Sequence, residues 1–257
     1  EVTCAPADPV TAADRAIAIR EITREIARIE GWRASFAPKT AANGVGNGVH
    51  IHFSLVDSEG HPVGYDPSAP GGLSAASASF CAGVLRHLPA LTLLSASSRS
   101  SGLRLRPQSW SASWTWLADR DREAGLRICP LTTIGGRDPA PQFNVEYRAA
   151  DATANPYLAM AGIIRAGLAG IAETLPRPPL PTDHPDTMSE AQREAFGLRR
   201  LPDNPAAALA AWEADSHARA WFPPALIETL RCVRNAEAER LAGLDDEQVC
   251  QLYRDLY

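Results

Sequence analysis

The sequence predicts an α+β fold, with helices on the outside of a curved antiparallel sheet. Apolar residues recur at helical spacing in residues 11–31 and dominate residues 156–172. They alternate strictly with polar residues in 49–55 and again in 143–148, which is typical of strands with one buried face. From residue 189 onward the pattern is helical. The 257 residues suffice for one large domain or two small ones.

The first third of the chain is predicted to alternate between helix and strand. Isoleucines spaced as on a helix face indicate an amphipathic helix that Gly31 ends. A glycine-rich turn then precedes the alternating segment. The expected elements are a helix over 11–31, a short strand over 32–38, a turn over 43–48, a strand over 49–55, a loop over 60–72 and a helix from 73 through Pro89 toward 94.

The remainder is predicted to add three strands and then mostly helices. Asn155 is a suitable cap for a helix that begins at Pro156, and this helix is apolar nearly all round, so it is expected to be buried. The expected elements are strands over 103–106, 125–129 and 142–148, a helix over 156–172, a proline-rich connector over 176–185, and helices over 206–220, 224–241 and 245–257.

Charge and cysteine content narrow the function classes. The formal net charge is −5, which argues against nucleic acid or an anionic membrane as the main partner. Five widely spaced cysteines without a CxxC pair argue against a disulfide framework or a zinc knuckle, and they favour a reducing cytoplasm. Neither an apolar run of membrane-spanning length nor a signal peptide is expected.

The polar faces of the predicted strands carry the chemistry. If these strands share one sheet, their polar sides form one concave surface that carries ligands for a hard cation and guanidiniums for phosphates or carboxylates. Such equipment suits phosphoryl transfer. The alternative is an exposed sheet face held by ion pairs. The residues on this surface are His50, His52, Ser54, Arg104, Arg127, Glu146 and Arg148.

Four longer motifs, in order, identify a resemblance that runs nearly end to end. Residues 36–39 (FAPK) resemble an FMPKP strand, and residues 46–55 (GNGVHIHFSL) resemble an NGSGMHxHxSL segment. Residues 120–128 (RDREAGLRI) resemble RNRxxxxRI, and residues 145–158 resemble ExRxPDxxANPYL. Together they are similar to the catalytic domain of glutamine synthetase and its relatives.

The resemblance implies a glutamine synthetase/guanido kinase-like catalytic domain over residues 1–257, with 186–257 as its helical C-terminal portion. The family's N-terminal β-grasp domain would then be absent. The family uses ATP and two divalent cations, Mg²⁺ or Mn²⁺, to join the γ-carboxylate of glutamate to ammonia or an amine. It works in rings of identical subunits, so a homo-oligomer binding small molecules, with neither nucleic acid nor membrane as partner, is expected.

The resemblance also assigns roles position by position. It implies that an acyl phosphate forms, which an amine then attacks in a site that excludes water. The metal ligands would be Glu1, His50 and Glu146; the nucleotide contacts His52, Ser54 and Arg127; the catalytic arginines Arg122, Arg104 and Arg148; and the substrate contacts Arg104, Arg148, Gly46 and Trp110.

Departures from the family pattern concern the acceptor. Trp110 stands where glutamine synthetases carry the flap glutamate that deprotonates ammonium, so an amine other than ammonia is expected. Val45 and Asn144 replace an asparagine and an arginine that bind substrate and phosphate. The alternatives are a plain packing role for Trp110, a catalytically retired homologue with a structural or regulatory role, and a hydrolase fused elsewhere to this family. Because the chain begins at Glu1, residues 1–257 alone are expected to be weakly active or inactive.

Overall fold

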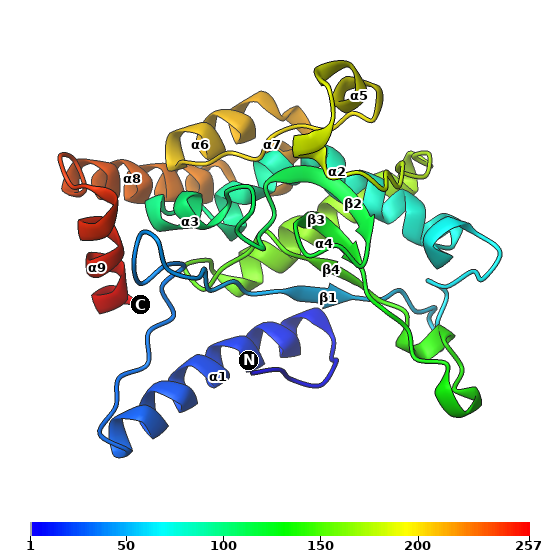
Figure 1. Cartoon of the computed structure of the whole chain (residues 1–257), viewed down its shortest axis with the longest axis horizontal. Coiled ribbons are helices and arrows are strands. Elements are labelled where there is room, and N and C mark those ends of the chain that lie inside the picture. Colours follow the sequence, from blue (N-terminus) through cyan, green and yellow to red (C-terminus); the bar gives the residue numbers. More distant parts are fainter. Residues whose placement is uncertain (1) are drawn as a thin grey trace.

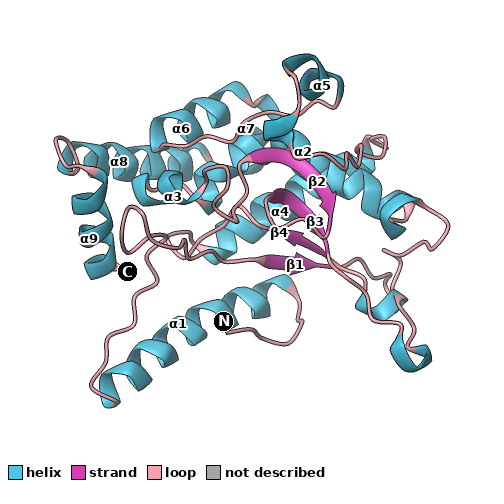
Figure 2. Ribbon diagram, viewed as in Figure 1, coloured by secondary structure: helices cyan, strands magenta, loops and turns pink. Residues whose placement is uncertain are grey.

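The computed structural model describes residues 2–257. Its centre is a four-stranded sheet in the order β1-β4-β3-β2 (Figures 1 and 2). The strands are β1 (Ile51–Phe53), β2 (Trp114–Asp119), β3 (Ala124–Ile128) and β4 (Val145–Tyr147). Strand β4 pairs antiparallel with both β1 and β3, whereas β2 and β3 are parallel. The α+β class is confirmed, but the sheet is mixed rather than wholly antiparallel. Arg120, which follows β2, has a left-handed backbone conformation. Because β2 and β3 are parallel, residues 120–123 run back toward the start of β2 before β3 begins.

Helices surround this sheet and form the whole C-terminal part of the chain. Four single turns of 3₁₀ helix interrupt the loops, at Pro70–Gly72, Ile134–Gly136, Ala140–Gln142 and Pro185–Thr187. The α-helices are α1 (Pro9–Ile29), α2 (Ala75–Ser95), α3 (Arg99–Arg104), α4 (Pro156–Ala172), α5 (Glu190–Ala195), α6 (Pro205–Ala214), α7 (Ser216–Trp221), α8 (Pro224–Arg240) and α9 (Asp246–Leu256).

Two predicted strands are wrong. Residues 103–106 do not form a strand, because Ser98 and Ser101 cap each other reciprocally and begin α3, which ends at Arg104. Residues 32–38 form no strand because their neighbour is α9, where the Phe36 amide donates to the Tyr257 carbonyl. The helix predicted over 206–220 is divided in two at Asp215, whose side chain caps α7.

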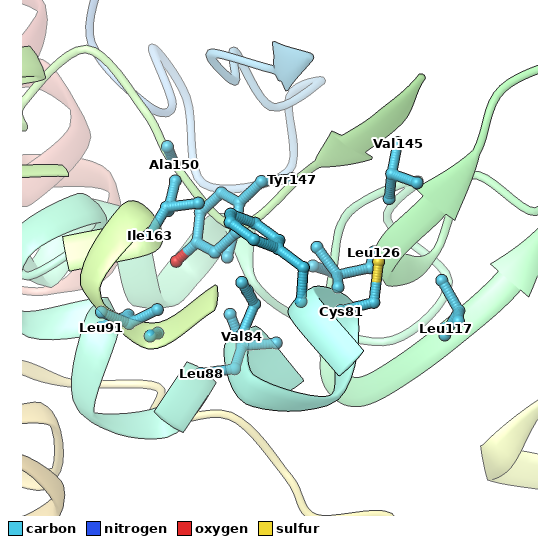
Figure 3. Packing of buried hydrophobic residues seen from close by; sticks show 14 of the residues in the cluster. Cys81, Val84, Leu88, Leu91, Leu117, Leu126, Val145, Tyr147, Ala150 and Ile163 are labelled. Carbon is cyan, nitrogen blue, oxygen red and sulfur yellow. The ribbon is translucent and has the colours of Figure 1, made fainter. Parts of the chain in front are cut away.

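The main core lies between the sheet and α2. Side chains on one face of the sheet, among them Leu126, Val145 and Tyr147, pack in one cluster with Val84 and Leu88 of α2 (Figure 3). Helix α2 is long and apolar enough to span a membrane by length and composition, contrary to the sequence expectation, but most of it is buried. It therefore behaves as the central helix of a globular core. On the opposite face, Trp116 and Ala118 of β2 pack against Met188 and Leu198, and polar side chains occupy β1, β3 and β4.

Helix α4 packs behind α2 through small residues. A Cβ on Gly83 of α2 would lie 2.2 Å from the carbonyl oxygen of Ala166, so the two backbones touch. Phe80 lies over Gly167 in the same contact. The outer side of α4 is only partly covered, since Leu168 is 52% exposed. The expectation that α4 is buried is correct for the face toward α2 and wrong for the outer one.

Helix α1 lies on the outside of the body and contacts α4 (Figure 1). Its existence is confirmed, and Asp8 caps its first turn. Its apolar stripe, however, is uncovered within residues 2–257: Ile22, Ile26 and Ile29 are each more than half exposed, and Ala13 alone in this helix is buried.

The contact between α2 and α4 should tolerate no added methyl group at Gly83. We expect Gly83→Ala to lower the free energy of unfolding by about 2–3 kcal/mol, because the new Cβ meets backbone that cannot rotate away. The matched control is Gly162→Ala, whose Cβ would meet the ends of Leu91 and Leu94 side chains. Urea unfolding of both variants measures the difference, and equal stability would contradict backbone contact at Gly83.

Candidate functional site

The Glu146 carboxylate lies at the centre of the polar sheet face. Within the sheet it sits directly between two neighbours, opposite His52 of β1 and opposite Arg127 of β3. Directly paired residues project to the same side with adjacent Cβ atoms. The alternation read from the sequence therefore brings these three side chains together, and Glu146 is only 1% exposed.

Three cationic or imidazole groups converge on this carboxylate. Arg148 Nη1 donates to Oε1 at 2.6 Å, Arg127 Nε lies 2.6 Å from Oε2, and His50 Nδ1 lies 2.9 Å from Oε1. Burial on its own would raise the pKa of Glu146. The hydrogen bond from His50 and the positive charges of Arg148 and His50 outweigh burial and lower the pKa to about 2. Glu146 is therefore a stable anion at neutral pH.

Arg148 joins this carboxylate to two loops. Its Nε donates to the carbonyl of Arg122 at 2.8 Å, and its Nη2 lies 3.4 Å from the carbonyl oxygen of Trp110. The guanidinium is thus shared by the sheet, the turn before β3 and the loop that carries Trp110. Trp110 itself is 73% exposed, so its indole is available to a ligand.

Arg104 forms a second, buried cationic position beside the glycine-rich loop. Its guanidinium donates to the carbonyls of Ala149 and Ala150 and to Ser111 Oγ, and the residue is 2% exposed. A Cβ at Gly46 would lie 2.7 Å from Arg104 Cγ, and one at Gly48 would lie 2.8 Å from Nη1. Glycine is therefore required where the loop passes over the arginine.

The structure assembles most of the predicted site, with clear exceptions. His50, His52, Arg127, Glu146 and Arg148 form one cluster. Arg104 and Gly46 contact each other beside it, although Arg104 comes from a helix and not from the predicted strand. Arg122 enters through its carbonyl while its side chain is exposed. Ser54 is exposed and makes no hydrogen bond to the cluster within residues 2–257. Glu1 lies outside the described residues.

Three further residues belong to this site although the sequence analysis assigned them no role. The Cys129 thiol lies 3.6 Å from His52 Nδ1, and burial raises its pKa. Asp151 lies 3.8 Å from Arg104 Nε, fully buried. Glu123 accepts hydrogen bonds from the loop that carries Trp110. Alternation in β3 places Cys129 on the same side as Arg127, but a cysteine reads as an apolar residue, so the pattern of polar residues did not mark it. Asp151 stands within the 145–158 motif.

Comparison with known proteins decides which family this geometry represents. The family model for the glutamine synthetase catalytic domain matches residues 1–253. The chain belongs to the glutamine synthetase family. The structure agrees, since it superposes on the crystal structure of a novel glutamine synthase homolog with a TM-score of 0.88 and 42% identity, over 100% of this chain and 56% of that one.

Two kinds of relative are similar to this glutamine synthetase family member. The gamma-glutamylpolyamine synthetase GlnA3 of Streptomyces coelicolor is 41% identical over 257 residues, covering 100% of this chain and 54% of the relative. The type-1 glutamine synthetase 1 of Dictyostelium discoideum is 37% identical over 70% of this chain and 35% of the relative. The chain therefore spans about half the length of the curated relatives that it matches.

The donors around Glu146 fit the divalent cations that this family uses, in part. An imidazole nitrogen of His50 and a carboxylate oxygen face each other at 2.9 Å. Within residues 2–257 no group of three or more His, Cys, Asp or Glu side chains is arranged to hold a metal ion. Mg²⁺ commonly takes one or two protein ligands and completes its shell with water and phosphate oxygens. Two donors are thus compatible with Mg²⁺ bound together with a nucleotide.

The low pKa of Glu146 predicts a loss of stability in acid. A carboxyl whose pKa falls on folding from 4.5 to about 2 stabilises the fold fully above pH 4.5, and this contribution is lost as the pH falls through 2. As the pH falls from 4.5 to 2, the free energy of unfolding of the wild type should decrease by up to about 3 kcal/mol more than that of Glu146→Gln. Urea unfolding at several pH values measures both slopes. Parallel slopes would mean that Glu146 titrates normally.

Proposed function

We propose that the whole protein is an ATP-dependent ligase. It joins the γ-carboxylate of glutamate, or of a similar acid, to an amine other than ammonia through an acyl-phosphate intermediate. The observation that carries this proposal is the cluster of His50, Glu146 and Arg148 directly below the loop of Trp110. It combines anion, imidazole and guanidinium within one buried site, which suits the positioning and neutralisation of phosphoryl groups.

The roles of the individual residues follow from their surroundings. We assign His50 and Glu146 to a divalent cation, taken as Mg²⁺, which when bound supplies charge neutralisation for ATP phosphates. Arg127, which binds Glu146 from β3, is assigned to the phosphates together with His52, Ser54 and the exposed Arg122 side chain. Arg104 and Arg148 are assigned to the acid substrate. Since both are buried, they act by setting the positive potential beneath it.

The acceptor is assigned from Trp110. An indole has no basic group, so it cannot deprotonate ammonium, but its exposed face attracts an organic cation or an apolar amine. The similar gamma-glutamylpolyamine synthetase supports an amine acceptor. We further propose a ring-forming homo-oligomer in the cytoplasm. The uncovered isoleucine stripe of α1 and the five free cysteines support these two assignments.

The decisive experiment uses the full-length protein with ATP, Mg²⁺, glutamate and a panel of mono-, di- and polyamines, with ammonium included. We expect phosphate release that depends on one class of amine and is much slower with ammonium. Trp110→Ala should raise the KM for that amine by about fivefold, because one cation–π contact is lost. Phe196→Ala, at an exposed aromatic that follows the last residue of α5, is the matched control and should leave this KM unchanged.

Two outcomes would overturn parts of this assignment. Equal rates with ammonium would contradict the amine preference. Absence of phosphate release with every acid–amine pair would favour a catalytically retired homologue. The observation that supports this alternative is that Arg104 donates to protein carbonyls and to Ser111.

The metal assignment makes a separate prediction about binding. In the full-length protein, His50→Ala should abolish the Mg²⁺-dependent part of ATP binding, since one of the two described donors is lost. Isothermal titration with and without Mg²⁺ measures this part directly. His61→Ala is the control, because His61 lies at an exposed turn against Asp57. Unchanged Mg²⁺-dependent binding in His50→Ala would remove His50 from the metal site.

A further inference from the structure

The loop that carries Trp110 has an unusual backbone. Gln108 and Trp110 both adopt left-handed conformations, with φ of 58° and 51°. Residues with a Cβ avoid this region because the Cβ approaches a carbonyl oxygen. Two such residues in three positions persist only when surrounding groups hold them.

One carboxylate provides this hold. Glu123 Oε2 accepts the backbone N–H of Gln108 at 3.0 Å, and Oε1 accepts that of Trp110 at 3.1 Å. The Glu123 side chain is 14% exposed, whereas the two residues whose N–H groups it binds are exposed. His184 of the connector places its Nε2 3.1 Å from Oε2 and closes the outer side of the carboxylate. Charge-assisted bonds of this kind are the stronger class.

The carbonyl group of the same residue faces the site. The carbonyl of Trp110 faces Arg148, and Arg148 in turn binds Glu146. Trp110 is thus fixed by an anion at its N–H and by a cation at its C=O. Its indole has no such restraint and stays exposed. The orientation of the indole therefore depends on the backbone, and the backbone depends on Glu123. The RNRxxxxRI motif leaves position 123 unspecified.

We propose that Glu123 is a positioning residue for the acceptor. It holds Gln108 and Trp110 in their left-handed conformations, so that the Trp110 indole forms one wall of the amine site. This inference rests on the proposed amine-ligase function. It differs from a catalytic role, because the contacts of both carboxylate oxygens are to backbone N–H groups of the loop and to His184.

Two readouts on the intact full-length protein test this role. Glu123→Ala removes both charge-assisted hydrogen bonds to the loop. The KM for the amine should therefore rise about tenfold or more, since one such bond is already worth about that factor, whereas the KM for ATP should change less than about twofold. Glu123→Gln keeps one acceptor oxygen and should be intermediate. Amide hydrogen exchange of peptides covering residues 105–112 should be faster in the same order. Glu239→Ala, an exposed carboxylate on α8, is the control.

The outcomes separate this inference from the function on which it rests. Unchanged exchange in Glu123→Ala would overturn the proposal that Glu123 holds the loop, whatever the activity. Faster exchange with an unchanged amine KM would overturn the link between the loop and the acceptor. A wild-type protein without amine-dependent phosphate release would overturn the proposed function, and the exchange measurement would still decide whether Glu123 holds the loop.

Discussion

The buried ion-pair cluster around Glu146 is the constraint on which the rest of the site depends. A carboxylate that is 1% exposed is costly unless its charge is matched, and here Arg127 and Arg148 match it while His50 adds a hydrogen bond. Matching requires neighbouring strands in register and loops of the right length. The sheet order, with β4 between β1 and β3, supplies this register. Removing Glu146 would leave Arg127 and Arg148 without their shared carboxylate at the centre of the sheet.

The apolar side of the sheet supports this cluster mechanically. Strand residues that alternate with Glu146, such as Val145 and Tyr147, pack on α2, and α2 is held against α4 by backbone contact at Gly83. Glycines in helices cost conformational entropy, so their presence here indicates that close approach is worth more than helix propensity. A helix pair that touches at the backbone gives the strands a rigid support, and side chains on the far face keep their distances.

Sequence reasoning was most reliable where one periodicity governed a segment. The alternation at His52, Glu146 and Arg127 predicted which side chains share a face, because period two is a property of the strand itself. It failed at Arg104, where serine capping favoured a helix over the strand that Leu103 and Leu105 suggested. It also gave no sign of Glu123, whose role depends on backbone amides 13 and 15 residues away in sequence. A hydrogen bond from a backbone N–H does not depend on the type of residue that donates it, so no sequence pattern marks it.

The order of the strands places this site beside one edge of the sheet. Strand β1 is at one end of the sheet, and no strand of residues 2–257 pairs with its outer edge. His52 therefore lies on the edge strand itself, and Glu146 lies one strand further in. Any strand that adds there, from a longer chain or a neighbouring copy, will set its own side chains directly beside His52. A segment bound along β1 would therefore add side chains to this site, whereas the ion pairs around Glu146 are formed by residues 2–257 alone.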